Sequence, residues 1–128
     1  MSRPPPQTLV IMARLTTHVL DTTRGMPAAG IMIELYLLQG DQRRPLTTRV
    51  TNADGRTEEP LLASESLETG MYELVFRVTD YFRLGNATIT TPAFLGDIVI
   101  RFGIADPTAN YHVPLLVSPY GYTTYRGS

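Results

Sequence analysis

The fold class is decided by the stretch that closes the chain, Tyr111-His-Val-Pro-Leu-Leu-Val-Ser-Pro-Tyr-Gly-Tyr-Thr-Thr-Tyr-Arg-Gly-Ser128. It predicts a β-hairpin with strands over Tyr111–Ser118 and Gly121–Arg126, joined by a turn at Pro119-Tyr120. Because the chain stops directly after a patterned strand, we expect the terminus to have a role beyond closing the sheet.

Strand parity assigns a face to the histidine of this hairpin. Successive side chains of a strand point to opposite faces of the sheet. One face of the first arm is apolar except for a tyrosine hydroxyl, so it should face the core; its members are Tyr111, Val113, Leu115 and Val117. His112 then lies on the outer face with Pro114 and Leu116. An outer face this apolar predicts that a partner subunit covers it. On the second arm, parity leaves open whether Thr123 and Tyr125 or their neighbours face outward.

The rest of the chain repeats short strands between turn residues. Apolar or alternating runs predict strands over Leu9–Leu20, Ile31–Leu38, Arg44–Thr51, Gly70–Val78 and Asp97–Phe102. The stretch from Thr79 to Gly85 predicts one short helix, capped by Thr79 or Asp80 and ended by Gly85. Strands about ten residues apart with turn signals between them are typical of an all-β, antiparallel two-sheet sandwich.

Composition bounds the possible functions. The 128 residues suit one domain, which we place at 9–128 behind an extended, proline-rich arm at 1–8. The net charge of −1 gives no basic excess for nucleic acid or a membrane surface. No apolar run approaches the ~18 residues that a spanning helix needs. Cysteine is absent, so no disulfide forms.

Three side chains stand out as candidates for chemistry. His18 and His112 are the only histidines, and imidazole is the side chain that titrates near neutral pH. The alternative is that they are two unrelated, half-buried residues. Arg56 follows a turn at Asp54-Gly55, where its guanidinium is either solvated or aimed at an anionic ligand. No His/Cys cluster predicts a metal site, and neither a glycine-rich phosphate loop nor a Gly-x-Ser-x-Gly elbow occurs.

Four separate stretches together resemble the transthyretin-like 5-hydroxyisourate hydrolases. They are Leu15-Thr-Thr-His-Val-Leu-Asp-Thr-Thr-Arg-Gly-Met-Pro-Ala28, Thr51-Asn-Ala-Asp-Gly-Arg56, Gly70–Phe76 with Asp80-Tyr-Phe82, and the closing hairpin with its Tyr-Arg-Gly-Ser ending. The resemblance covers about Leu9 to Ser128. The proline-rich arm lies outside the family's motifs, and the wording of Gly85–Gly96 departs from the family's usual form.

The resemblance implies a transthyretin-like sandwich that assembles as a homotetramer, a dimer of dimers, with active sites where the dimers meet. It implies hydrolysis of 5-hydroxyisourate, a small-molecule substrate, without a cofactor. The implied catalytic residues are His18, Arg56 and His112, with one histidine as general base and the choice between them open. The implied substrate-binding residues form the ending: Tyr125, Arg126, Gly127 and Ser128.

Two other classes stay open. A transthyretin-like carrier would bind a small aromatic ligand in the same channel without hydrolysing it. An interaction module would use the chain terminus as a docking peptide. The ending is not a Ser-Lys-Leu-type address, so we predict a cytoplasmic location and leave the peroxisome open.

Overall fold

The computed structural model describes residues 13–85 and 87–127. The predicted arm at 1–8, the residues 9–12 and Ser128 lie outside the described residues, so the domain boundary stays a prediction. Nine strands and one helix are seen in this part of the chain, and two of the strands have two residues each. In chain order they are β1 (Arg14–Asp21), β2 (Met26–Pro27), β3 (Met32–Gln39), β4 (Gln42–Val50), β5 (Leu62–Ala63), β6 (Gly70–Phe76), α1 (Val78–Leu84), β7 (Ile98–Ile104), β8 (Tyr111–Ser118) and β9 (Gly121–Thr124).

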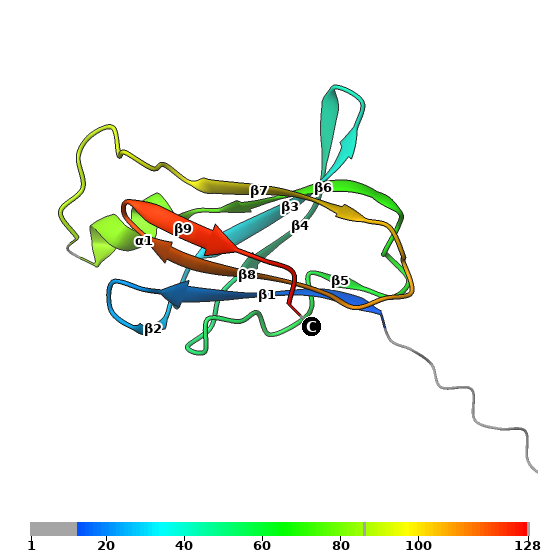
Figure 1. Cartoon of the computed structure of the whole chain (residues 1–128), viewed down its shortest axis with the longest axis horizontal. Coiled ribbons are helices and arrows are strands. Elements are labelled where there is room, and N and C mark those ends of the chain that lie inside the picture. The colour runs from blue at the N-terminus through cyan, green and yellow to red at the C-terminus, as the bar shows by residue number, and fades with distance from the viewer. Residues whose placement is uncertain (1–12, 86, 128) are drawn as a thin grey trace, which may run out of the picture.

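The strands form two sheets that pack face to face (Figure 1). One sheet has the order β2-β1-β8-β9, with β5 pairing the other end of β1, and the second has the order β4-β3-β6-β7. All pairs are antiparallel except β1 with β8, which run parallel. The predicted all-β sandwich with one short helix is therefore confirmed, with one parallel pair at the centre of the first sheet.

The core lies between the sheets because each strand places alternate residues inward. On β1, Leu15 and Val19 are fully buried, and on β8 Leu115 and Val117 are fully buried. The predicted parity of the closing hairpin is thus confirmed, since His112 lies on the outer face. Burying an aliphatic side chain of this size contributes about 1.5–3 kcal/mol to the free energy of folding.

The helix has the predicted position but a different beginning. α1 starts at Val78, its N-cap residue is Arg77, and no side chain of the cap position binds the first turn. The expected cap by Thr79 or Asp80 is wrong; instead the carboxylate of Asp97 accepts a hydrogen bond from the Thr79 N–H at 3.3 Å. A carboxylate from a distant segment does here what a local cap would otherwise do, because both satisfy an amide that has no partner within the helix.

Two further segments lie against β1 and β8. The segment after β9 continues along β8 in the same direction (Figure 1), and Gly127 forms an isolated antiparallel bridge with His112. The turn at 52–56, between β4 and β5, docks on β1 through a hydrogen bond from the Val19 N–H to the Gly55 carbonyl at 2.8 Å.

Candidate active site

The site is built on the outer face of the parallel pair β1–β8. The register places Thr16 beside His112 and His18 beside Pro114. Because the alternate residues of both strands fill the core, these side chains share the opposite, outer face. Central strands hold their side chains in fixed directions, which favours a defined geometry at this face.

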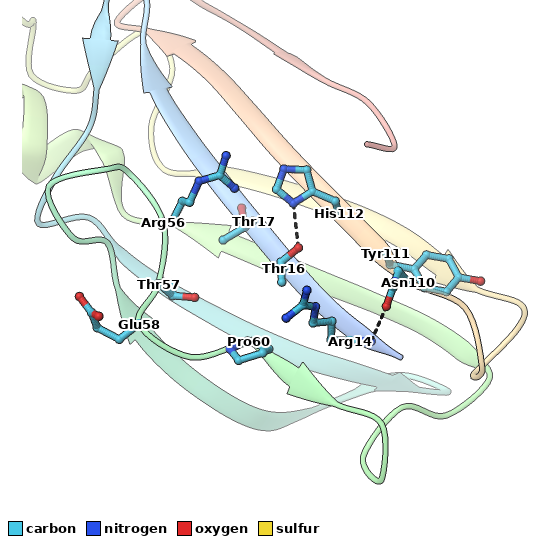
Figure 2. A pocket seen from close by; sticks show the side chains of 10 residues that line it. All are labelled: Arg14, Thr16, Thr17, Arg56, Thr57, Glu58, Pro60, Asn110, Tyr111 and His112. Atoms are coloured by element: carbon cyan, nitrogen blue, oxygen red, sulfur yellow. Dashed lines mark hydrogen bonds between the residues drawn. The ribbon is translucent and has the colours of Figure 1, made fainter. Parts of the chain in front are cut away.

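An open cavity of about 430 Å³ lies over this face. Figure 2 shows Arg56 entering from the loop on one side of β1 and His112 from β8 on the other. The remaining lining includes Arg14, Thr57 and Asn110. Two of the three sequence candidates, Arg56 and His112, therefore meet in one cavity although they lie far apart in the chain.

His112 is held by its neighbour across the strand pair. Its Nδ1 lies 2.8 Å from the hydroxyl oxygen of Thr16, within hydrogen-bond distance (Figure 2). Burial lowers the pKa of His112 below its ordinary value, and the positive charges of Arg56 and His18 lower it further, while a hydrogen bond to Thr16 acts in the opposite direction. The ring is therefore neutral at neutral pH, which is the state that a general base requires.

His18 is fixed from the other side. Its Nε2 lies 2.9 Å from the backbone carbonyl oxygen of Asp54. A carbonyl oxygen only accepts hydrogen bonds, so Nε2 carries the hydrogen and, in the neutral ring, Nδ1 carries the lone pair. His18 belongs to the same face as His112, close enough for a positive charge on its ring to lower the pKa of His112.

The described part of the chain ending lies against His112. The Gly127 N–H donates to the His112 carbonyl at 2.7 Å. A Cβ added at Gly127 would lie 2.6 Å from Cδ2 of the His112 ring, a distance that side chains do not tolerate. The backbone of Gly127 therefore packs directly on the imidazole because it has no side chain.

The strand register also gives the face on which Tyr125 lies. The pairs Leu116–Thr123 and His112–Gly127 place Thr123 and Gly127 on the outer face. Tyr125 is two positions from each of them and therefore shares that face. Tyr125 and Arg126 line a second open cavity, of about 770 Å³, that shares His112 with the first.

Arg126 also anchors the ending. Its guanidinium carbon lies 4.3 Å above the centroid of the Tyr111 ring, and Nη2 donates to the Asn110 carbonyl at 3.2 Å. Ser128, the last predicted binding residue, lies outside the described residues.

This arrangement brings together groups that suit hydrolysis. A neutral imidazole and a guanidinium face one cavity, which provides a proton acceptor and a stabiliser for developing negative charge. Within residues 13–85 and 87–127, no group of three or more His, Cys, Asp or Glu side chains gathers in a way that could hold a metal ion.

The sequence as a whole matches a known protein family. A family model described as "Transthyretin: HIUase/Transthyretin family" matches residues 15–127. The chain belongs to this HIUase/transthyretin family. The resemblance inferred from the sequence motifs is therefore confirmed.

Two relatives are named 5-hydroxyisourate hydrolase. A protein of Rhizobium meliloti named 5-hydroxyisourate hydrolase 2 is 56% identical over 115 residues, which cover 90% of this chain and 96% of the relative. A Pseudomonas aeruginosa 5-hydroxyisourate hydrolase is 52% identical over 91% of this chain and 93% of its own length.

Solved structures agree with the fold. The Klebsiella pneumoniae 5-hydroxyisourate hydrolase superposes with a TM-score of 0.74 at 32% identity, covering 91% of this chain and 100% of that one. An (S)-allantoin synthase gives a TM-score of 0.86 at 42% identity over 91% of this chain, which spans only 44% of that longer protein. Transthyretin from Sparus aurata, at 24% identity and a TM-score of 0.80 over 90% of this chain and 97% of its own, shows the shared fold alone.

Two contacts of this site were not predicted from the sequence. Thr16 contacts His112 only because β1 and β8 pair in parallel. The one sign of this contact in the sequence is that Thr16 is polar and, two positions before His18, lies on the same outer face. The Asp54 carbonyl touches His18, and a backbone atom leaves no signal in residue type.

Within residues 13–85 and 87–127, no helix has the length and apolar composition needed to cross a membrane.

Proposed function

We propose that the chain hydrolyses 5-hydroxyisourate, the product of urate oxidation, to 2-oxo-4-hydroxy-4-carboxy-5-ureidoimidazoline. The observation that carries this proposal is the meeting of Arg56 and His112 in one cavity, in a chain more than half identical to proteins named 5-hydroxyisourate hydrolase. The enzyme is a hydrolase that opens a cyclic amide, and its substrate is a small planar molecule.

His112 is the general base of the proposed reaction. Its lowered pKa keeps it neutral, so it takes a proton from water as the water oxygen attacks the amide carbonyl carbon. Nε2 accepts that proton when Nδ1–H donates to the hydroxyl of Thr16. The C–N bond of the ring then breaks, and the leaving nitrogen takes a proton while the carbonyl carbon becomes a carboxyl group.

Arg56 and His18 have complementary roles in this proposal. The Arg56 guanidinium binds the substrate's carbonyl oxygens and stabilises the negative charge of the tetrahedral intermediate, a type of stabilisation whose loss costs about 10²–10³ in rate. His18 has its Nε2–H engaged by the Asp54 carbonyl, so Nδ1 is the ring nitrogen left to act. In the neutral ring the Nδ1 lone pair accepts a hydrogen bond from the water; in the protonated ring Nδ1–H gives a proton to the leaving nitrogen.

The ending closes the site. Gly127 packs on the His112 ring, and Tyr125 lies on the same face of the sheet. Arg126 holds the segment in place through Tyr111 and the Asn110 carbonyl. Ser128 completes the proposed substrate-binding set with its hydroxyl.

We also propose a homotetramer, a dimer of dimers, in the cytoplasm. The outer face around the site carries the partly exposed Leu20 and Leu116, beside Tyr125, which is 58% exposed. In the described part of the chain, β7 and β9 each pair on one side only. Free edges and an apolar face both favour association with further copies. Sedimentation velocity should give four times the chain mass, and a stable monomer would contradict this proposal.

An absorbance assay tests the activity directly. 5-Hydroxyisourate is generated in place from urate with a urate oxidase, and its loss is followed with and without the purified chain. Acceleration that grows with the concentration of the chain supports the proposal. An unchanged decay with tight binding of a small aromatic ligand would instead support the carrier alternative.

A further inference from the structure

The turn at 52–56 depends on one side chain. The Oδ1 of Asn52 accepts from the Asp54 N–H at 2.9 Å and from the Arg56 N–H at 3.2 Å. The Asn52 backbone takes part as well, because its carbonyl accepts from the Gly55 N–H at 2.9 Å and its N–H donates to the Arg56 carbonyl at 2.7 Å. All four of these hydrogen bonds have Asn52 as a partner, an arrangement for which Asn and Asp are suited.

The same turn lies unusually close to β1. Gly55 has φ +75°, and a Cβ placed on it would be 2.4 Å from the Val19 carbonyl oxygen. The hydrogen bond from the Val19 N–H to the Gly55 carbonyl fixes this close approach. The turn is therefore located relative to β1 by backbone contacts, and its internal shape is set by Asn52.

The shape of this turn sets the surroundings of two proposed catalytic residues, His18 and Arg56. It points the Asp54 carbonyl at Nε2 of His18, and it holds the Arg56 backbone where the side chain lines the cavity. If the carbonyl turned away, His18 would lose the acceptor that holds the hydrogen on Nε2, and both neutral tautomers would be populated.

We propose that Asn52 is a positioning residue that fixes the His18 tautomer and the direction of Arg56 through the 52–56 turn. Its effect on rate rests on the proposed hydrolase function, but its effect on the tautomer does not. The ordinary alternative is that Asn52 only stabilises an exposed turn, in which case its loss would lower stability and leave the imidazole unchanged.

Two substitutions at Asn52 in the full chain separate these readings. Asn52→Leu keeps the size of the side chain and removes the acceptor, whereas Asn52→Asp keeps an acceptor oxygen. Both lose the hydrogen bond from Nδ2 to Glu58, which is 3.1 Å long in the native chain, so Asn52→Asp controls for that loss.

The direct readout is the ¹⁵N NMR spectrum of the imidazoles with His18 neutral. The native protein should show a protonated Nε2 and an unprotonated Nδ1 for His18. Asn52→Leu should shift both signals toward intermediate positions, and Asn52→Asp should keep the native pattern. In the absorbance assay, kcat should fall about 10-fold or more in Asn52→Leu, since base catalysis of this kind contributes about 10²–10⁴ in rate.

A second pair of variants keeps the proposal testable if Asn52→Leu fails to fold. Gly55→Ala should displace the turn from β1, because its Cβ would lie 2.4 Å from the Val19 carbonyl oxygen. The same Cβ would lie 3.3 Å from Cδ2 of His18, so the result that counts is a loss of the protonated-Nε2 pattern and not a small shift of the signals. Gly40→Ala is the matched control, since Gly40 also has a positive φ of +59° but nothing within 4 Å of an added Cβ.

The outcomes are distinct. A native His18 spectrum in both Asn52→Leu and Gly55→Ala would overturn the proposal, and so would a changed spectrum with an unchanged kcat. If the native chain does not hydrolyse 5-hydroxyisourate, the proposed function fails, while the spectra still decide whether the turn sets the tautomer.

Discussion

The Nδ1 of His112 lies 2.8 Å from the hydroxyl oxygen of Thr16, across the parallel pair of β1 and β8. The two residues are 96 positions apart in the chain, and the strand register alone brings them together. The contact joins one ring nitrogen of the proposed base to a hydroxyl group, which both donates and accepts hydrogen bonds.

Removal of this hydroxyl should impair His112 without unfolding the sheet. Thr16→Val replaces the hydroxyl by a methyl group of similar shape, and we expect kcat to fall about 10-fold because the ring loses the partner at Nδ1. Thr16→Ser keeps the hydroxyl and should stay within a few-fold of the native rate. Equal activities of the two variants in the absorbance assay would contradict this role of Thr16.

The three proposed catalytic residues should each be needed. His112→Ala, Arg56→Ala and His18→Ala should lower the rate of 5-hydroxyisourate loss by about 10² or more, because each removes a proton-transfer or charge-stabilising group. Sedimentation and circular dichroism should show that the assembly and fold survive. Full activity of His112→Ala would remove His112 from the base role.

The activity should rise with pH and then level off. Since burial, Arg56 and His18 lower the pKa of His112, the midpoint of the rise in kcat/KM should lie below the ordinary pKa of histidine. Arg56→Gln removes a positive charge that opposes protonation and should raise the pKa of His112. NMR titration of the ring in both proteins measures this shift; a pKa that falls in Arg56→Gln would contradict the electrostatic assignment.

Gly127 should tolerate no side chain. In Gly127→Ala, the new Cβ would lie 2.6 Å from the His112 ring, so either the ring or the ending must move, and we expect at least a 10-fold loss of kcat. Gly121→Ala is the control, because its Cβ would meet only the Ser118 hydroxyl at 3.8 Å. A fully active Gly127→Ala would mean that the ending does not position His112.

Stability at the helix end of the sandwich should depend on Tyr81. Its hydroxyl donates to the carboxylate of Asp21 at 2.7 Å, and Asp21 is only 1% exposed. Tyr81→Phe should lower the free energy of unfolding by about 1–3 kcal/mol, because a buried charged acceptor loses a partner. Urea unfolding measures this, and an unchanged midpoint would contradict it.

The pH dependence of that difference follows from the titration of Tyr81. Two causes raise the pKa of Tyr81 from its ordinary value of 10.0 to about 12. The larger is burial, and the second is the hydrogen bond to Asp21. A group with a raised pKa in the folded state contributes stability below its unfolded pKa and loses it as pH rises through the folded one. The advantage of the native protein over Tyr81→Phe should therefore shrink as pH rises from 10 to about 12.

The residue pattern determined the sandwich, the closing hairpin and the outward face of His112. Alternation is a local property: Val113 and Leu115 must enter the core, so the histidine before them cannot. The motifs likewise determined the family. The two-residue strands β2 and β5 were not predicted, because segments so short carry no alternation and form only where β1 offers a free edge.

Tertiary structure alone decided which groups meet at the site. No local pattern predicts that β1 and β8 run parallel, because that pairing is stabilised by contacts between distant segments of the core. Thr16 becomes the partner of His112 only through that register, and the Asp54 carbonyl becomes the partner of His18 only because Gly55 docks on Val19. Residue types thus fixed the available chemistry, and packing fixed which atoms lie close enough to carry it out.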